Sequence, residues 1–235
     1  MARLARVVLP DCWHHVTQRG NHRQEVFPDD ASRRFYLEVL RHQCEKYAVR
    51  LGGYCLMGNH VHLLAIPARA NSLAGALGRT HNDYARWLNL RCGRTGHLWQ
   101  NRFYSCAMDE AHRWDALRYV ELNPVRAGLA RYATDWEWSS AQAHCSGLDR
   151  LRLLDWSDWF DRWTPITWND VLEHGVDDVD LLSRIREATL SGRVAGDEEF
   201  LAMAERALGR SLRPKKRGPR AKTAVPESNL SFEVA

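Results

Sequence analysis

The stretch YCLMGNHVHLLAIP, residues 54–67, contains two apolar runs separated by the dipeptide GN. A Gly-Asn type of dipeptide between apolar runs is typical of a two-residue turn of reversed type, so the stretch predicts a sharp β-hairpin. The second run carries His60 and His62 with Val61 between them. Because alternate residues of a strand share a face, both imidazoles are expected on one face, with Val61 and Leu63 in the core on the other.

Two imidazoles side by side suit a divalent cation. The same pair can instead be a hydrogen-bonded structural pair that binds nothing. An H-x-H sequence occurs in metalloenzymes of many kinds, so the two histidines alone name no reaction.

The other elements follow from apolar spacing and cap residues. We expect a first strand at 12–21, helices at 29–49 and 71–93, a further strand at 97–108, a helix at 109–124 and a short closing helix at 136–144. With the hairpin, this order predicts an α+β fold, a ferredoxin-like split βαβ antiparallel sheet with one extra helix. We expect the 60–66 strand inside the sheet, the 30–47 and 72–92 helices on one face, and the 109–123 helix beside the histidines.

Composition changes along the chain predict its division into segments. Residues 1–150 form the main domain, residues 151–177 an acidic, Trp-rich linker or docking segment, and residues 178–222 a small helical extension with a basic tail. The extension is expected to hold helices at 178–192 and 197–209, and residues 223–235 are expected to be disordered.

The composition also limits where the protein works. No apolar run approaches the roughly 20 residues of a membrane span, and the N-terminus is a poor signal peptide, so a cytoplasmic, nucleoid-associated location and no membrane partner are expected. The six cysteines form no C-x-x-C pair. They are expected to be reduced, which disfavours a disulfide framework and a zinc ribbon.

Charge points to nucleic acid as the first partner to test. The net charge of +4 is made up of +7 in residues 1–154, −8 in residues 155–199 and +5 in residues 200–235. Only four of the 33 basic residues are Lys, and Arg suits bidentate contacts to phosphate and guanine. A coding bias from a GC-rich genome explains the same excess of Arg, so composition alone does not decide.

A tyrosine adds a second chemical group to the histidine pair. In RYVELNPVRAGL, residues 118–129, Tyr119 and Asn123 are four apart and share a helix face. A phenol with a pKa of about 10 is a weak nucleophile, and a divalent cation on a phosphate offsets this by neutralising the phosphoryl oxygens. The resulting phosphotyrosine suits breaking and rejoining of strands. Tyr104 is the best competing tyrosine.

Four motifs in order give the sequence a family resemblance. They are HHVTQRGN (14–21), MGNHVHLL (57–64), GHLWQNRFYS (96–105) and RYVELNPVRAGL (118–129). Together they resemble the signature of the REP-associated tyrosine transposases, single-tyrosine members of the HuH endonuclease superfamily. The resemblance covers roughly residues 3–145. Gly58 stands where the family motif usually has Pro.

The resemblance implies a metal-dependent enzyme that cleaves and rejoins single-stranded DNA beside REP-type hairpins. His60 and His62 match the metal ligands, Tyr119 the nucleophile, and Asn123 a polar third ligand. Mg²⁺ or Mn²⁺ is the expected ion, since imidazole favours Mn²⁺ while cellular supply favours Mg²⁺. The candidate DNA contacts are Arg19, Arg102, Arg126, Lys215, Lys216 and Arg217. Trp99 and Phe103 suit either base stacking or the core.

Two alternatives remain open. The chain can be a catalytically silent hairpin-binding protein derived from such a transposase, or an unrelated H-x-H metalloenzyme such as a hydrolase. The intact set of His60, His62, Tyr119 and Asn123 argues against the first. The basic balance of residues 1–154, and the lack of a third His, Asp or Glu beside the H-x-H, argue against the second. One tyrosine per chain fits a monomer or a dimer that shares its sites.

Overall fold

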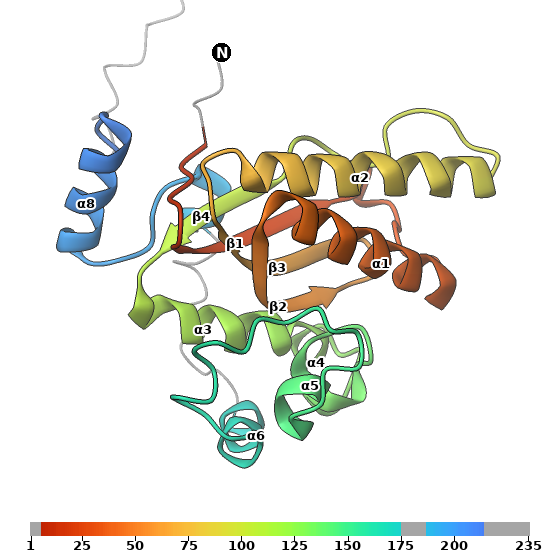
Figure 1. The fold of residues 1–235 in the computed structure, drawn as a ribbon. Coiled ribbons are helices and arrows are strands. Elements are labelled where there is room, and N and C mark those ends of the chain that lie inside the picture. Colours follow the sequence, from red (N-terminus) through yellow and green to blue (C-terminus); the bar gives the residue numbers. More distant parts are fainter. Residues whose placement is uncertain (1–5, 175–186, 214–235) are drawn as a thin grey trace, which may run out of the picture.

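A four-stranded antiparallel sheet forms the centre of the molecule (Figure 1). The computed structural model describes residues 6–174 and 187–213. Its strands are β1 (Trp13–Arg19), β2 (Val49–Leu56), β3 (His60–Pro67) and β4 (Tyr104–Met108), in the order β2-β3-β1-β4. This is the predicted ferredoxin-like arrangement, in which β3 lies inside the sheet between β2 and β1.

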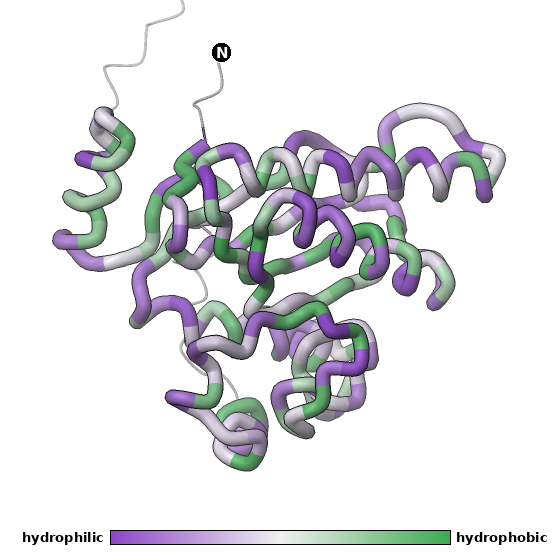
Figure 2. The backbone as a smooth tube through the Cα atoms, in the orientation of Figure 1, coloured by the Kyte–Doolittle hydropathy of each residue, from purple (hydrophilic) through white to green (hydrophobic). Residues whose placement is uncertain are grey.

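Helices cover both faces of the sheet (Figure 1). Helices α1 (Asp30–Tyr47) and α2 (Ser72–Arg91) lie on one face, and α3 (Glu110–Glu121) lies on the other, as predicted. Val61 and Leu63 of β3 belong to the core under α1 and α2, whereas Leu64 belongs to the core under α3. Figure 2 shows the hydrophobic residues along the strands and the hydrophilic ones on the outer turns.

Local signals in the sequence set the ends of these helices. Asp29 and Ser32 form a capping box at the start of α1, and Asp109 accepts a hydrogen bond from the backbone N–H of His112 at the start of α3. Gly93, just after α2, has a φ of +60°, which a glycine adopts without steric cost.

The turn between β2 and β3 differs from the prediction. Neither Gly58 nor Asn59 has a positive φ, which the reversed turn types require. Tertiary hydrogen bonds use both carbonyls instead: that of Gly58 accepts from the N–H groups of Val26 and Phe27, and that of Asn59 from the N–H of Gly20. The hydrogen bonds to the 20–27 segment therefore determine the conformation of the turn, and the local preference of the Gly-Asn dipeptide does not.

We expect Gly58→Ala to raise the free energy of unfolding by about 0.4–1 kcal/mol, because alanine restricts the unfolded chain and fits the native backbone. An added Cβ would meet only Glu25 Oε1, at 3.7 Å. Chemical denaturation measures the change. Gly93→Ala is the matched control: it too has open space, but its positive φ should make the substitution destabilising. Equal effects of the two substitutions would contradict the explanation.

The strand predicted at 97–108 is shorter than expected. Only Tyr104–Met108 pairs as β4, while residues 97–103 form a loop across the end of β1. Trp99 holds this loop, since its indole N–H donates to the carbonyl of His81 and its ring lies 4.9 Å from the His81 ring, centroid to centroid. Backbone hydrogen bonds also tie the loop to the end of β1, from the N–H of Asn21 to the carbonyl of Leu98 and from the N–H of Gln100 to that of Arg19. Contact with β1 therefore continues here without a regular ladder.

The chain after α3 continues through short elements. They are α4 (Asn123–Arg126), the 3₁₀ turn η2 (Ala133–Asp135), α5 (Ala141–Ser146) and α6 (Pro165–Glu173); a further 3₁₀ turn, η1 (Asn21–Arg23), follows β1. The predicted 109–124 helix thus ends earlier, at Glu121, and the predicted 136–144 helix begins later, at Ala141. Ser140 pairs instead with β2, where its N–H donates to the carbonyl of Tyr54.

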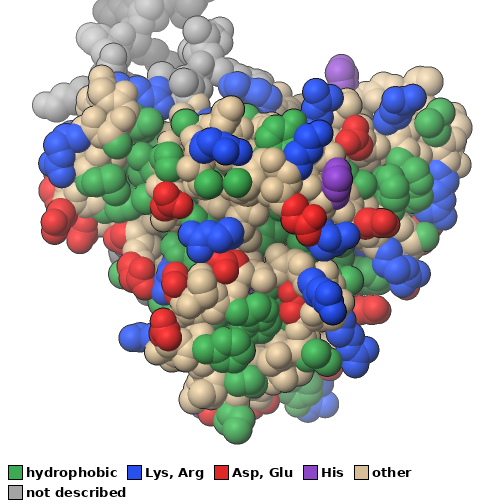
Figure 3. Space-filling model, in the orientation of Figure 1, with side chains coloured by type: hydrophobic (Ala, Val, Ile, Leu, Met, Phe, Trp, Pro, Cys, Tyr) green, Lys and Arg blue, Asp and Glu red, His purple; other side chains and the backbone are tan. Residues whose placement is uncertain are grey.

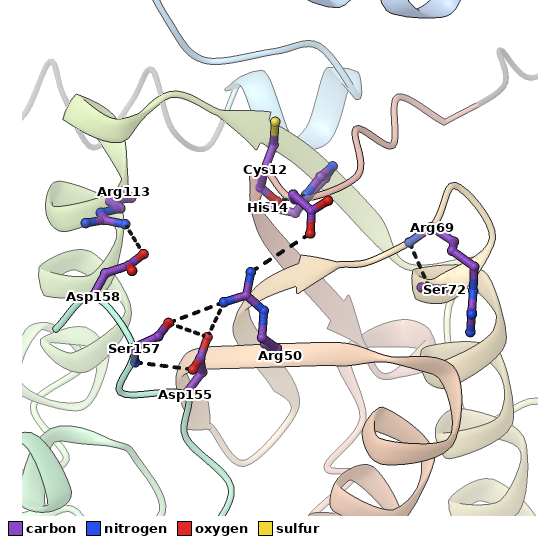
Figure 4. A network of polar contacts seen from close by, with 10 residues as sticks. Cys12, His14, Arg50, Arg69, Ser72, Arg113, Asp155, Ser157 and Asp158 are labelled. Atoms are coloured by element: carbon purple, nitrogen blue, oxygen red, sulfur yellow. Dashed lines mark hydrogen bonds and ion pairs between the residues drawn. The ribbon is translucent and has the colours of Figure 1, made fainter.

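Part of the Trp-rich segment 151–177 packs on the main domain in its described residues, 151–174. Trp159 and Trp168 are buried in the cluster that contains Leu117 of α3. Two ion pairs add to this packing, Arg50 to Asp155 at 2.7 Å and Arg113 to Asp158 at 3.1 Å (Figure 4). These contacts attach the segment to the main domain, and its role as linker or docking segment stays a prediction.

The C-terminal extension packs beside β4. Helix α8 (Glu198–Leu208) contributes Ala204 to a small cluster with Val7 and Leu9. The N–H of Ala195 donates to the carbonyl of Ala107, at 2.8 Å. Residues 187–191 are helical, so they fit the predicted 178–192 helix, whose earlier part lies outside the described residues. Also outside them lie 214–222 of the basic tail, with Lys215, Lys216 and Arg217, and the polar terminus.

Two further observations concern all of the described chain. Cys12, Cys44, Cys55, Cys92, Cys106 and Cys145 are free thiols. In residues 6–174 and 187–213, no helix is long and apolar enough to cross a membrane.

Candidate active site

The two histidines of β3 lie side by side beneath α3. The ring centroids of His60 and His62 are 5.0 Å apart, with the ring planes at 79°. Their i, i+2 spacing places both on the face opposite Val61, as the strand alternation predicts. This arrangement meets the geometric requirement for a shared cation.

The side-chain amide of Asn59 determines which ring nitrogen of His60 carries the proton. The Nδ1–H of His60 donates to Asn59 Oδ1 at 2.6 Å, and Asn59 Nδ2 in turn donates to the carbonyl of Arg23. Since Asn59 Oδ1 can only accept, the proton of neutral His60 lies on Nδ1. The lone pair of His60 is therefore on Nε2, the atom left for a cation.

A third histidine, which the sequence analysis did not single out, contacts His62. His15 of β1 stacks on His62 with ring centroids 5.1 Å apart and planes 7° apart, and His15 Nε2 lies 2.9 Å from His62 Nδ1. The other nitrogen of His15, Nδ1, lies 2.8 Å from Thr189 Oγ1. A strand pairing brings His15 and His62 together, so no local motif could have revealed the contact.

Burial keeps these histidines neutral. Desolvation lowers the pKa of His60 to about 4, with the nearby charge of Arg19 adding to the effect. Desolvation also lowers the pKa of His15 to about 3 and holds that of His62 well below its usual value, helped by His15 and His60. Neutral imidazole is the form that can bind a metal.

Acid should unfold the protein through its buried histidines. The pKa is lowered by burial to about 4 in His14 and His60 and to about 3 in His15 and His81. Between these values and the usual value of about 6.5 the unfolded chain binds more protons, so stability is full above that range and falls with decreasing pH. We expect denaturation curves to show a loss of up to about 1.4 kcal/mol per pH unit for each histidine.

The variant His81→Gln supplies the control for this pH dependence. It removes one titrating group and keeps an atom that can reach Tyr36, whose hydroxyl lies 3.1 Å from His81 Nε2. The slope of stability against pH should then fall by about a fifth if five histidines, these four and His62, contribute equally. A slope that is unchanged, or stability that is flat between pH 7 and 4, would contradict the explanation.

Tyr119 of α3 lies against the same histidines. Its side chain is 3% exposed, and its ring meets those of His62 and His15 edge to face at centroid distances of 5.6 and 5.8 Å. The guanidinium carbon of Arg126 lies 4.2 Å from the centre of the Tyr119 ring, and its NH2 group donates to the carbonyl of Tyr119. The tyrosine is thus held from both sides beside the histidine pair.

Asn123 has a structural role that its sequence position explains. Its Nδ2 donates to the carbonyls of Tyr119 and Val120, at 3.0 and 3.4 Å. Pro124 has no N–H to bond the carbonyl of Val120, so the side chain of Asn123 replaces that donor at the end of α3. Only Asn123 Oδ1 is then left for a cation. In the described part of the chain, no three His, Cys, Asp or Glu residues gather to hold a metal.

Tyr104, the competing tyrosine, lies on a strand that does not neighbour β3. Thr17 of β1 is in register with His62 on one side and with Tyr104 on the other. Tyr104 therefore shares the histidine face but lies two strands from β3, with 36% of its surface exposed. Tyr119, by comparison, contacts the His62 ring directly.

The predicted DNA-contact residues lie in different surroundings. Arg19 is exposed and in register with His60, whereas Arg126 is packed on Tyr119. Arg102 lines a groove of about 660 Å³ between α2 and the 97–103 loop. Trp99 and Phe103 pack in the core cluster under α1 and α2. Figure 3 shows basic side chains scattered among acidic ones over the α1–α2 side.

A buried carboxylate lies within the same motif as Tyr119, and the sequence analysis missed it. Glu121 is fully buried, with Oε1 bonded to Ser140 Oγ at 2.5 Å and to His144 Nδ1 at 2.6 Å. Its Oε2 accepts from the indole N–H of Trp168 at 2.8 Å. Glu121 thus joins α3 to α5 and α6, and only its burial distinguishes it from a surface glutamate.

Comparison with known proteins finds sequences that are similar to this chain. The family model described as "Transposase IS200 like" matches residues 8–123, which include His60, His62, Tyr119 and Asn123. A Haemophilus influenzae protein named "Putative REP-associated tyrosine transposase" is 26% identical over 116 residues, 45% of this chain and 66% of that protein. The match therefore spans just under two thirds of the relative.

One of two similar solved structures shares the fold. "Structure of the REP associates tyrosine transposase bound to a REP hairpin" matches with a TM-score of 0.51 and 16% identity, covering 67% of this chain and 96% of the other. A crystal structure of a putative transposase from Deinococcus radiodurans matches with a TM-score of 0.36 and 18% identity, over 51% of this chain and 96% of the other.

Proposed function

We propose that this chain is a REP-associated tyrosine transposase of the IS200-like family, whose model matches residues 8–123, and that it cleaves and rejoins single-stranded DNA through Tyr119. One observation carries the proposal. The ring of Tyr119 lies edge-on to that of His62, 5.6 Å away, on the sheet face that also presents His60. A nucleophile beside two metal-ligand candidates is the arrangement that phosphodiester cleavage by a phenol needs.

The proposed reaction conserves the phosphodiester bond. The phenol oxygen of Tyr119 attacks phosphorus and the phenol gives up its proton, while the bond from phosphorus to the 3′ oxygen breaks and that oxygen leaves as a hydroxyl. The 5′ phosphate of the DNA stays on the tyrosine. A 3′ hydroxyl of another strand end then attacks the phosphotyrosine and releases Tyr119, which rejoins DNA.

The residues present fit a divalent cation, Mg²⁺ or Mn²⁺. His60 Nε2 and His62 Nε2 have no hydrogen-bond partner among the described residues, and Asn123 Oδ1 supplies a hard oxygen donor. A cation bound there would neutralise charge on the phosphate oxygens. Asn59 orients His60, Arg126 orients Tyr119, and the exposed Arg19 beside His60 offers a positive charge to the phosphate.

The proposed DNA partner is a hairpin with single-stranded flanks. The solved relative with the shared fold is bound to a REP hairpin, and we propose the same class of DNA here. The experiment that tests the function is incubation of the full chain with labelled hairpin DNA and Mn²⁺, followed by a denaturing gel. A covalent adduct supports the proposal. Hairpin binding without any adduct would favour the alternative, a catalytically silent hairpin-binding protein.

We also propose that the basic tail adds affinity that is indifferent to sequence. Residues 210–222 carry seven cations, including Lys215, Lys216 and Arg217, and no acid. Each phosphate contact contributes up to about one unit to the slope of log affinity against log salt. Deletion of the tail should lower that slope while the cleavage position stays the same. A slope that does not change after truncation would count against the tail as a DNA contact.

A further inference from the structure

We propose that His15 is a positioning residue that holds His62 in the tautomer able to bind a cation, and that Thr189 holds His15 in turn. The inference rests on the proposed metal site and adds to it two residues outside the predicted ligand set. It follows from a chain of contacts that runs from the C-terminal extension through β1 to β3.

The contacts leave these rings little freedom. His15 and His62 are 2% and 5% exposed, and their rings are stacked almost parallel. His15 Nε2 lies 2.9 Å from His62 Nδ1, and His15 Nδ1 lies 2.8 Å from Thr189 Oγ1, whose side chain is also buried. Both nitrogens of His15 are therefore used within the protein, which excludes His15 itself as a further ligand in this arrangement.

The direction of the hydrogen bond between His15 and His62 decides whether His62 can bind a cation. If His15 donates from Nε2, His62 Nδ1 must accept, and neutral His62 then carries its proton on Nε2, where a cation would bind. If His62 donates from Nδ1 to His15 Nε2, the lone pair of His62 lies on Nε2. His15 then carries its own proton on Nδ1 and donates it to Thr189 Oγ1. Only this second direction is compatible with a bound metal.

Through Thr189, the C-terminal extension contacts the histidines of the proposed site. Thr189 is 174 residues from His15 in sequence, and it lies beyond the region that resembles the catalytic family. The helical residues 187–191 bring its hydroxyl to the back of the histidine pair. The extension therefore supports the metal ligands from behind, in addition to its packing against β4.

Four variants of the full chain test this inference through Mn²⁺ affinity, measured by electron paramagnetic resonance. His15→Leu should weaken Mn²⁺ binding by about 10–100-fold, the usual effect of losing an outer-shell partner. His15→Gln places an acceptor oxygen at the reach of Nε2 and should restore most of the affinity. Thr189→Val should lose less than His15→Leu. Thr17→Val is the matched control, since its hydroxyl bonds the carbonyl of Val61 instead of a ring, and it should bind like the wild type.

Long-range ¹H–¹⁵N spectra of the metal-free protein show which nitrogen of each histidine ring carries the proton. If His15 only supported the packing, its substitution would not change the tautomer of His62. We expect His62 to carry its proton on Nδ1 in the wild type and on Nε2 in His15→Leu. Two results would overturn this inference and leave the proposed metal site standing. One is a wild type that binds Mn²⁺ although its His62 carries the proton on Nε2. The other is equal Mn²⁺ affinity in the wild type and in His15→Leu. A wild type that binds no Mn²⁺ would overturn the proposed metal site as well.

Discussion

Tyr119→Phe should form no covalent adduct with DNA and should still bind the hairpin. The substitution removes one oxygen, the proposed nucleophile, and keeps the ring that packs on His15 and His62. The guanidinium of Arg126 also keeps its contact with the ring and its hydrogen bond to the carbonyl of residue 119. Because those contacts remain, the fold and the DNA surface should survive. A denaturing gel measures adduct, and a native gel at the same salt concentration measures binding.

Two control variants separate the nucleophile from the metal and from the competing tyrosine. His60→Ala should also abolish the adduct, but together with Mn²⁺ binding, whereas Tyr119→Phe should bind Mn²⁺ normally. Tyr104→Phe should cleave almost like the wild type, because Tyr104 lies two strands from β3. An adduct with Tyr119→Phe but none with Tyr104→Phe would show that Tyr104 is the nucleophile.

Glu121→Ala should lower the free energy of unfolding by about 3–5 kcal/mol, since each buried donor left without an acceptor costs about 1–3 kcal/mol. Three groups would lose their shared acceptor: the hydroxyl of Ser140, the imidazole of His144 and the indole N–H of Trp168. His144 is enclosed further by Trp159, whose ring is stacked on it at 5.2 Å. Water has little access to replace the lost carboxylate, so the desolvation cost stays uncompensated.

Chemical denaturation with two comparison variants measures this effect. Glu121→Gln keeps one acceptor oxygen and should cost less than Glu121→Ala. Glu38→Ala, on the exposed side of α1, should change stability by no more than about 0.5 kcal/mol. Equal stabilities of Glu121→Ala and Glu38→Ala would show that the buried contacts carry no net stabilisation.

The sequence determined the parts of the fold and site that depend on local periodicity. The alternation of His60, Val61 and His62 fixes which side chains share a face, whatever the strand pairs with. The order of strands and helices leaves few sheet topologies, and the ferredoxin-like one is found. The four-residue spacing of Tyr119 and Asn123 places Asn123 just past the end of the helix that carries Tyr119, where the side chain of Asn123 bonds the carbonyl of Tyr119.

Only the tertiary structure decided what those groups contact. His15 reaches His62 across 47 residues, and Thr189 reaches His15 across 174. The docked 20–27 segment changes the turn at Gly58, and the indole of Trp99 helps to hold a loop where a strand was expected. In each case the contact joins segments far apart in the chain. Periodicity and propensity describe neighbours in sequence, whereas buried hydrogen bonds and packing are decided by which distant segments the fold brings together.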